Sequence, residues 1–412
     1  MSGGAGVFGR RFAYCVLGFS QRVAGEVSLC EHAVMLRVLR PIRWMLGVAA
    51  MAMVFACDDA VPSLPGEPIA ETRDIIVYGD GTMPLCGGNA DAWQAHIEAI
   101  ARRYVGSAPR DKIHVIWTNR PDDYCNNGRS GCAFIGHDPM IVVSEAWSMK
   151  HELAHAASAP LFGSSKIPFL EEGFAELWSD STEMPREDLI PYISATQASQ
   201  VRYSAAAHFL HWVEENYGAT AVAALLTGSE RKDDQDERFH GLEEHLGVAF
   251  EELQLAFWGT APAYAPGFDR CSDRESGPDY TLDLDDRVEF DVLLDCAGDA
   301  LGPFPFPFVS DGGRPYVTRR VDVNEAGMYR IGSDNGDTVL LPCDPVDDAI
   351  EAAFWTVEET ILREQGPARM SRHLRLRPGR YQLWVIGPPG AASEQHVTLL
   401  PSLSLSRRVG RN

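Results

Sequence analysis

The chain of 412 residues has little positive charge: 36 lysines and arginines stand against 58 aspartates and glutamates, for a formal net charge of −22. A protein this acidic repels the phosphate backbone of nucleic acids, so we expect no nucleic-acid partner. The hydrophobic content of 45% is enough for packed cores. A chain of this length has room for about two domains.

A long hydrophobic run at the N-terminus is also missing. The apolar stretch from Trp44 to Ala56 follows three arginines and is too short to span a bilayer as a permanent helix. Its length is that of a signal-peptide core. We therefore predict that residues 1–57 are a targeting segment and that residues 58–72 are a linker. Met35 is an alternative start of the chain.

The targeting segment ends in Ala56-Cys57, which resembles a bacterial lipoprotein cleavage site. This favours an exported protein of the cell envelope, in the outer membrane or periplasm, with a lipid on Cys57. Simple secretion is the alternative. Membrane contact is expected only through this N-terminal anchor.

The sequence contains no C-x-x-C pair, which argues against a cysteine-rich zinc site. Cys125 and Cys132 flank a short polar loop and are predicted to form a disulfide. Cys271 and Cys296 are further disulfide candidates. An even number of cysteines beyond Cys57 in an exported chain favours disulfides, although the spacing does not fix their connectivity. These cysteines are Cys86, Cys125, Cys132, Cys271, Cys296 and Cys343.

The pattern along the chain predicts an α+β protein with two domains. Residues 73–262 combine short apolar runs with amphipathic helical segments, and residues 275–402 contain short alternating segments separated by turns, as in a β-sandwich. In the first region we predict the strands Ile75–Tyr78, Ile113–Trp117 and Met140–Val143 and the helices Asp91–Val105, Ser199–Tyr217 and Leu246–Trp258. A further helix, capped by Ser144, is predicted to end near Pro160.

That capped helix contains the sequence His-Glu-Leu-Ala-His, from His151 to His155. Residues four apart lie on one face of a helix, so His151 and His155 can bind one metal ion. Glu152 lies about 100° around the helix and can reach a metal-bound water without binding the metal. This is the chemistry of the H-E-x-x-H motif.

A second acidic helix is predicted after Pro168, in Leu-Glu-Glu-Gly-Phe-Ala-Glu. Glu172 and Glu176 are four residues apart and therefore share a face. Glu172 can supply a third metal ligand, and Glu176 can accept a hydrogen bond from a ligand histidine. Gly173 beside Glu172 would allow two helices to approach closely.

Together, H-E-L-A-H and L-E-E-G-F-A-E resemble the gluzincins, the zinc peptidases that include the thermolysin-like and aminopeptidase branches. The resemblance covers roughly residues 140–260. It implies a zincin-like metallopeptidase domain with His151, His155 and Glu172 as zinc ligands and Glu152 as catalytic base. The chain departs from the family pattern at Glu171, where asparagine is common.

The family resemblance favours an endopeptidase acting on peptides or proteins. The aminopeptidase branch carries a G-x-M-E-N-like strand, which the sequence Pro139–Ser144 lacks. We expect that strand to pair with an extended substrate instead. Tyr203 is the candidate donor to the oxyanion that forms during hydrolysis. His208 and His211 are rivals on the same helix, although structural roles suit them better.

Two other functions fit parts of the sequence. A non-catalytic, zinc-bearing envelope lipoprotein could bind a protein or glycan partner through its β-sandwich. A glycoside hydrolase could use an acid pair such as Glu171 and Glu176. The first alternative would not require Glu152, which the chain retains, and the second leaves both motif histidines unexplained.

Overall fold

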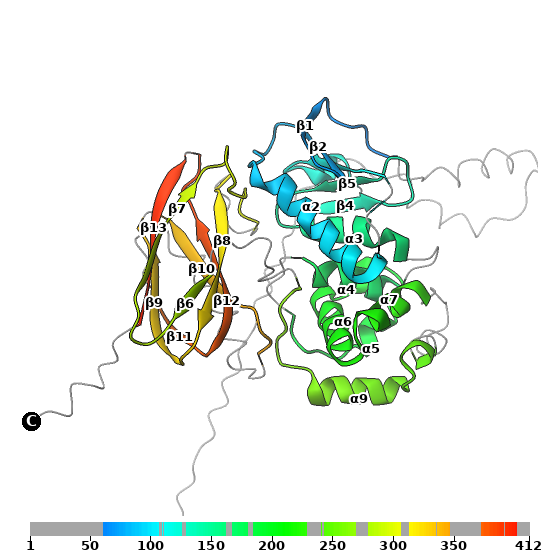
Figure 1. Cartoon of the computed structure of the whole chain (residues 1–412). Coiled ribbons are helices and arrows are strands. Elements are labelled where there is room, and N and C mark those ends of the chain that lie inside the picture. The colour runs from blue at the N-terminus through cyan, green and yellow to red at the C-terminus, as the bar shows by residue number, and fades with distance from the viewer. Residues whose placement is uncertain are drawn as a thin grey trace, which may run out of the picture. The chain divides into compact units, whose positions relative to one another are not determined.

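The computed structural model shows a mixed α+β protein (Figure 1). The predicted targeting segment, with Cys57, and the disulfide candidate Cys271 lie outside the residues that the structure describes. Among the described residues, no helix is long and apolar enough to cross a membrane. The described residues are 61–106, 109, 111–125, 129–161, 167–179, 184–228, 240, 243–268, 279–305, 313–334, 336–346, 372–390 and 392–401.

A five-stranded sheet forms the base of the first region, in the order β1-β2-β3-β5-β4. The three central strands are parallel, and the outer strands β1 and β4 run antiparallel to their neighbours. Apolar residues dominate the central strands because both of their faces are buried. The strands are β1 (Pro68–Glu71), β2 (Ile75–Gly79), β3 (Ile113–Trp117), β4 (Gly131–Phe134) and β5 (Ile141–Ser144).

Two predictions about this sheet are wrong. The predicted linker 58–72 contains strand β1, because Pro68–Glu71 pairs with β2. The expected pairing of Pro139–Ser144 with a substrate is also excluded, since β5 is already bonded to β3 on one side and β4 on the other. The outer strand beside β5 is β4, a four-residue strand that the sequence pattern did not predict.

Helices pack against this sheet and against one another around one apolar core. α2 continues as a π-helical segment, Ala101–Val105, so the single helix predicted for Asp91–Val105 starts earlier and changes type. The helices are α2 (Gly88–Ile100), α3 (Met149–Ser158), α4 (Pro168–Leu177), α5 (Ile190–Ile193), α6 (Tyr203–Tyr217), α7 (Ala219–Gly228) and α9 (Phe250–Thr260).

Ser144 does not cap α3, contrary to the prediction. It is the last residue of β5, and α3 begins only at Met149. The hydroxyl of Ser144 instead lies 2.7 Å from that of Ser148 and donates to the carbonyl of Glu145. The tight connection between β5 and α3 is therefore held by side-chain hydrogen bonds that precede the helix.

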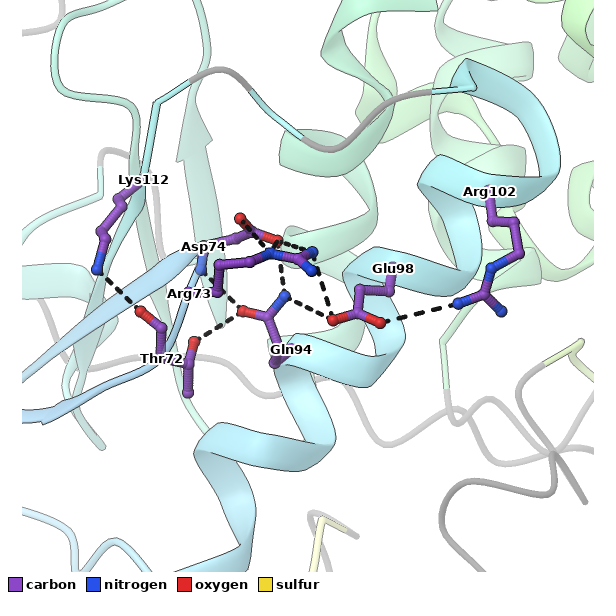
Figure 2. Close-up of polar contacts among 7 residues, drawn as sticks. All are labelled: Thr72, Arg73, Asp74, Gln94, Glu98, Arg102 and Lys112. Carbon is purple, nitrogen blue, oxygen red and sulfur yellow. Dashed lines mark hydrogen bonds and ion pairs between the residues drawn. The ribbon is translucent and has the colours of Figure 1, made fainter.

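A polar network fixes α2 to the start of β2 (Figure 2). The amide oxygen of Gln94 on α2 accepts hydrogen bonds from the Thr72 hydroxyl and the Asp74 backbone, both at 2.8 Å. The amide nitrogen of Gln94 donates to Asp74 and to Glu98. Arg73 forms ion pairs with the same two carboxylates. One buried glutamine thus joins the helix to the segment that leads into β2.

The region from residue 279 onward contains two four-stranded sheets, ordered β10-β12-β8-β6 and β11-β9-β13-β7. Side chains from both sheets form one shared apolar core, which is the arrangement of a β-sandwich. The strands are β6 (Tyr280–Leu282), β7 (Val288–Leu294), β8 (Tyr316–Val323), β9 (Gly327–Ser333), β10 (Asp337–Pro342), β11 (Arg372–Leu376), β12 (Gly379–Ile386) and β13 (Ser393–Pro401).

Two similar turns brace this β-sandwich. The hydroxyl of Tyr329 donates to the carbonyl of Glu325 at 2.7 Å, and that of Tyr381 donates to the carbonyl of Arg377 at 3.0 Å. Both tyrosines are buried and reach back four residues, as in the tyrosine corners of other sandwiches.

Two disulfides are present among the described residues. Cys125–Cys132 closes the short loop as predicted. Cys296, a disulfide candidate, pairs with Cys86 across 210 positions of sequence, a partner that the spacing did not suggest. Next to this bond, the side chain of Asn89 exchanges two hydrogen bonds with the backbone of Gly302. Disulfides indicate an oxidising, exported environment.

Candidate metal centre

Helix α3 carries the two motif histidines and lies in the interior of the first region. Every residue of α3 is buried, which is unusual for a helix that contains lysine, glutamate and two histidines. His151 and His155 lie one turn apart, with ring centroids separated by 4.8 Å. Buried polar side chains of this kind need partners, and helix α4 supplies them.

Three potential ligand atoms converge between α3 and α4. Nε2 of His151 lies 3.1 Å from Nε2 of His155 and 3.3 Å from Oε2 of Glu172. Nε2 of His155 lies 3.4 Å from the same carboxylate oxygen. Among the described residues, these three side chains form the one group of histidine, cysteine or acidic residues close enough to hold a metal ion.

The separations between these atoms fit a small metal ion. A tetrahedral ion with nitrogen and oxygen ligands at about 2.0–2.1 Å places neighbouring ligand atoms about 3.3 Å apart. The three observed distances, from 3.1 to 3.4 Å, lie close to that value. The ligand types, two imidazoles and one carboxylate, suit zinc and several other divalent transition metals.

A carboxylate faces the outer nitrogen of each histidine. Nδ1 of His151 lies 3.1 Å from Oε2 of Glu176, a hydrogen-bond distance at which an Nδ1–H donates to the carboxylate. That contact leaves Nε2 of His151 free to bind a metal. Nδ1 of His155 lies 3.9 Å from Oε1 of Glu171, which is too long for a hydrogen bond. Glu171 therefore lies near His155 without accepting a hydrogen bond from its Nδ1 atom.

Histidines and carboxylates in the cluster shift one another's pKa values. Burial acts to lower the pKa of His151, but hydrogen bonds with Glu172 and Glu176 raise it well above its usual value. Burial acts to raise the pKa of Glu172, but the adjacent His155 and His151 hold it far below its usual range. Glu172 is thus ionised at neutral pH, as a metal ligand must be.

Glu152 occupies the same helix, and its side chain lies against strand β4. A Cβ atom at Gly131 would lie only 2.7 Å from Cγ of Glu152, so no larger residue fits there without displacing the glutamate. Burial raises the pKa of Glu152, while His151 and His155 oppose the change. A carboxylate with a raised pKa accepts and returns protons nearer neutral pH.

Of the three candidate oxyanion donors, the structure brings Tyr203 to the site. Its ring stacks on His151 with centroids 5.4 Å apart and an interplanar angle of 10°. Burial and the nearby Glu172 raise the pKa of Tyr203, so its hydroxyl stays protonated and can donate. His208 and His211 are buried elsewhere on α6, against Phe257 and Phe268 respectively.

Sequence reasoning missed the contribution of strand β4. The sequence around β4 stands out only by Gly131 next to Cys132. Neither residue indicates that this strand contacts α3, which starts 18 positions later. The comparisons with known proteins add no assignment for the site: no family model matches this chain, and neither does any curated protein.

Proposed function

We propose that this chain is an exported, zinc-dependent peptidase of the gluzincin type, with a zincin-like fold in its first region and an accessory β-sandwich. The observation that carries the proposal is the convergence of His151, His155 and Glu172 at metal-ligand distances, with a buried Glu152 on the same helix. A coordination group of three protein ligands leaves a position for water or substrate, as in catalytic zinc sites.

A zinc ion held by these residues would polarise a substrate carbonyl and make a bound water acidic near neutral pH. Glu152 accepts the proton of the attacking water and passes it to the leaving amine. Its raised pKa suits both steps, because the carboxylate is a stronger base than an exposed glutamate. Tyr203 donates a hydrogen bond to the oxygen that gains charge during the attack.

Strand β4 would align the substrate in this proposal. It is one of the two terminal strands of the sheet, and it lies directly against Glu152 through Gly131. An extended peptide can pair with a free strand edge through main-chain hydrogen bonds. Binding of this kind holds a bond in the middle of a peptide near Glu152, which favours an endopeptidase.

The test is metal analysis combined with a Glu152→Gln substitution. The purified chain is expected to hold one zinc per molecule and to cleave unstructured peptides until a chelator is added. Glu152→Gln should keep the zinc and lose at least about a hundredfold in kcat, the usual contribution of a general base. Glu215→Gln, which changes a half-exposed carboxylate on α6, serves as the control and should cleave normally.

Absence of zinc at neutral pH would rule out the proposal. Normal cleavage by Glu152→Gln would rule out the mechanism. Zinc without any cleavage would favour the alternative function, a non-catalytic envelope lipoprotein that binds a protein or glycan through its β-sandwich.

The location in the envelope is a separate part of the proposal. Export is indicated by the disulfides, and a lipid on Cys57 is proposed from the Ala56-Cys57 junction. The Cys57→Ser variant should move from the membrane fraction to the soluble fraction. If both proteins fractionate alike, then the lipid anchor is wrong while the peptidase proposal stands.

A further inference from the structure

Ser148 stands at the N-cap position of α3, where a serine side chain usually accepts a hydrogen bond from the first turn of its helix. In α3, all of which the structure describes, the Ser148 side chain does not form this cap. Its hydroxyl instead donates to the backbone carbonyl of Ser130, just before β4, at 2.7 Å. A side chain that leaves its local structural role to bind another element is a candidate for a functional one.

The hydrogen bond from Ser148 reaches β4 next to the proposed catalytic base. Gly131 follows Ser130 and is the first residue of β4. A Cβ atom at Gly131 would lie 2.9 Å from Oε1 of Glu152 and 3.0 Å from Oγ of Ser148. Ser148 and Glu152 are four residues apart and share one face of α3. The hydroxyl therefore ties the start of β4 to the face of the helix that carries Glu152.

Further polar contacts fix the same point of β4. The carbonyl of Ser130 also accepts a hydrogen bond from the backbone N–H of Glu145 at 3.2 Å. Gly131 is paired with Ser144 at the end of β5, and the hydroxyl of Ser144 lies 2.7 Å from that of Ser148. Both hydroxyls are buried, so bulk water does not compete for their hydrogen bonds. Directional contacts of this kind define one position of the strand relative to α3.

The position of β4 relative to α3 matters if a peptide substrate pairs with this strand. The paired peptide takes its register from the strand through main-chain hydrogen bonds. Glu152 belongs to α3, so the offset between strand and helix decides which peptide bond lies beside it. A misplacement of about 1 Å can cost on the order of a hundredfold in rate.

We propose that Ser148 is a positioning residue whose hydroxyl holds β4 in register with Glu152 and thereby selects the peptide bond that is cleaved. The inference rests on the proposed peptidase function and on the proposed pairing of the substrate with β4. It implies recognition of the substrate through its main chain, so an extended peptide should be cut mainly at one bond.

The experiment compares the products that zinc-loaded wild-type and variant proteins release from one unstructured peptide, identified by mass spectrometry. Ser148→Ala should lose on the order of tenfold in kcat/KM at the main bond, as expected for one lost hydrogen bond. It should also cut neighbouring bonds in a larger share, because the peptide is no longer held in one register. Its zinc affinity should equal that of the wild type, since no ligand has changed.

Ser158→Ala is the matched control. Ser158 is buried on the same helix, and its hydroxyl donates to the carbonyl of Ala154 at 2.6 Å, within α3. Both variants lose one buried hydrogen bond, so their urea midpoints should fall by similar amounts. Only Ser148→Ala should change the product pattern. A loss of stability alone would alter the two variants alike, and the same product pattern in both would overturn the inference.

Hydrogen exchange provides a readout that does not depend on cleavage. The amides of β4 should exchange faster in Ser148→Ala than in the wild type or in Ser158→Ala. Unchanged exchange would show that the hydroxyl does not hold the strand, and the inference would be wrong. A wild-type protein without zinc and cleavage would refute the proposed function and this inference together, whereas normal cleavage with unaltered products from Ser148→Ala would refute the inference alone.

Discussion

The two regions of the described chain differ in what they bury. The β-sandwich buries Thr318, Ser333, Gln382 and Gln395 as its polar side chains, and no histidine, lysine or carboxylate is buried among those of its residues whose side chains the structure describes. The first region buries ionisable side chains on three helices, including the whole H-E-x-x-H motif. Burial of such groups costs free energy unless they are paired or bind a metal. The difference means that the buried ionisable groups which the proposed chemistry needs lie in the first region.

The largest expected difference between the regions is their response to acid. Burial lowers the pKa of both His208 and His211 on α6 to about 4, from 6.5 in an unfolded chain. The unfolded chain therefore binds more protons between these values, so the stability of the first region falls as the pH drops from 6.5 towards 4. At about 1.4 kcal/mol per pKa unit, the loss is on the order of 3 kcal/mol per histidine.

Hydrogen exchange of the metal-free protein at pH 7.5 and pH 5 can measure this contrast. The amides of α6 should lose protection in acid before those of β8 and β12. His211→Phe, which keeps an aromatic ring against Phe268, should reduce the pH dependence of the unfolding free energy. Equal pH dependence in the variant and the wild type would show that the buried histidines do not set the difference between the regions.

A smaller effect is expected from Glu176, the carboxylate behind His151. Glu176→Ala removes the acceptor that lies 3.1 Å from Nδ1 of His151. Loss of such an outer contact typically weakens metal binding by about 10- to 100-fold. Competition with a coloured zinc chelator measures the change. Unaltered zinc affinity would show that His151 is held in place by its packing alone.

The sandwich provides the matched control. Tyr329→Phe removes the hydrogen bond to the carbonyl of Glu325 and should cost about 1 kcal/mol in unfolding free energy. Zinc affinity should not change. If this substitution weakened zinc binding as much as Glu176→Ala does, the division between a chemical region and a stabilising region would be wrong.

Local sequence patterns predicted those strands and helices whose formation depends on residues near one another in the chain. The apolar runs of β2 and β3 and the alternation in the sandwich follow from burial on one or both faces of a strand. The four-residue spacings of His151 with His155 and of Glu172 with Glu176 likewise depend only on helix geometry. The convergence of Glu172 with both histidines needed a second helix, which the family resemblance suggested.

Features set by distant pairing could not be predicted in this way. Nothing near Cys86 or Cys296 indicates a bond across 210 positions, because the fold brings the two segments together. β1 and β4 have only four residues each and little hydrophobic pattern, so they become strands through their neighbours β2 and β5. The contact between Gly131 and Glu152 follows from that pairing.

Gly173 links the packing of the helices to the proposed chemistry. A Cβ atom at this position would lie 2.7 Å from Cβ of Ala206 on α6, so the two helices are as close as glycine permits. Glu172 is its neighbour in the chain, and the spacing of α4 from α6 therefore limits how far this ligand can move relative to the histidines of α3. Such a site is constrained by shape as well as charge: one added methyl group on the back of α4 would shift Glu172 relative to His151 and His155 without changing any of the three proposed ligands.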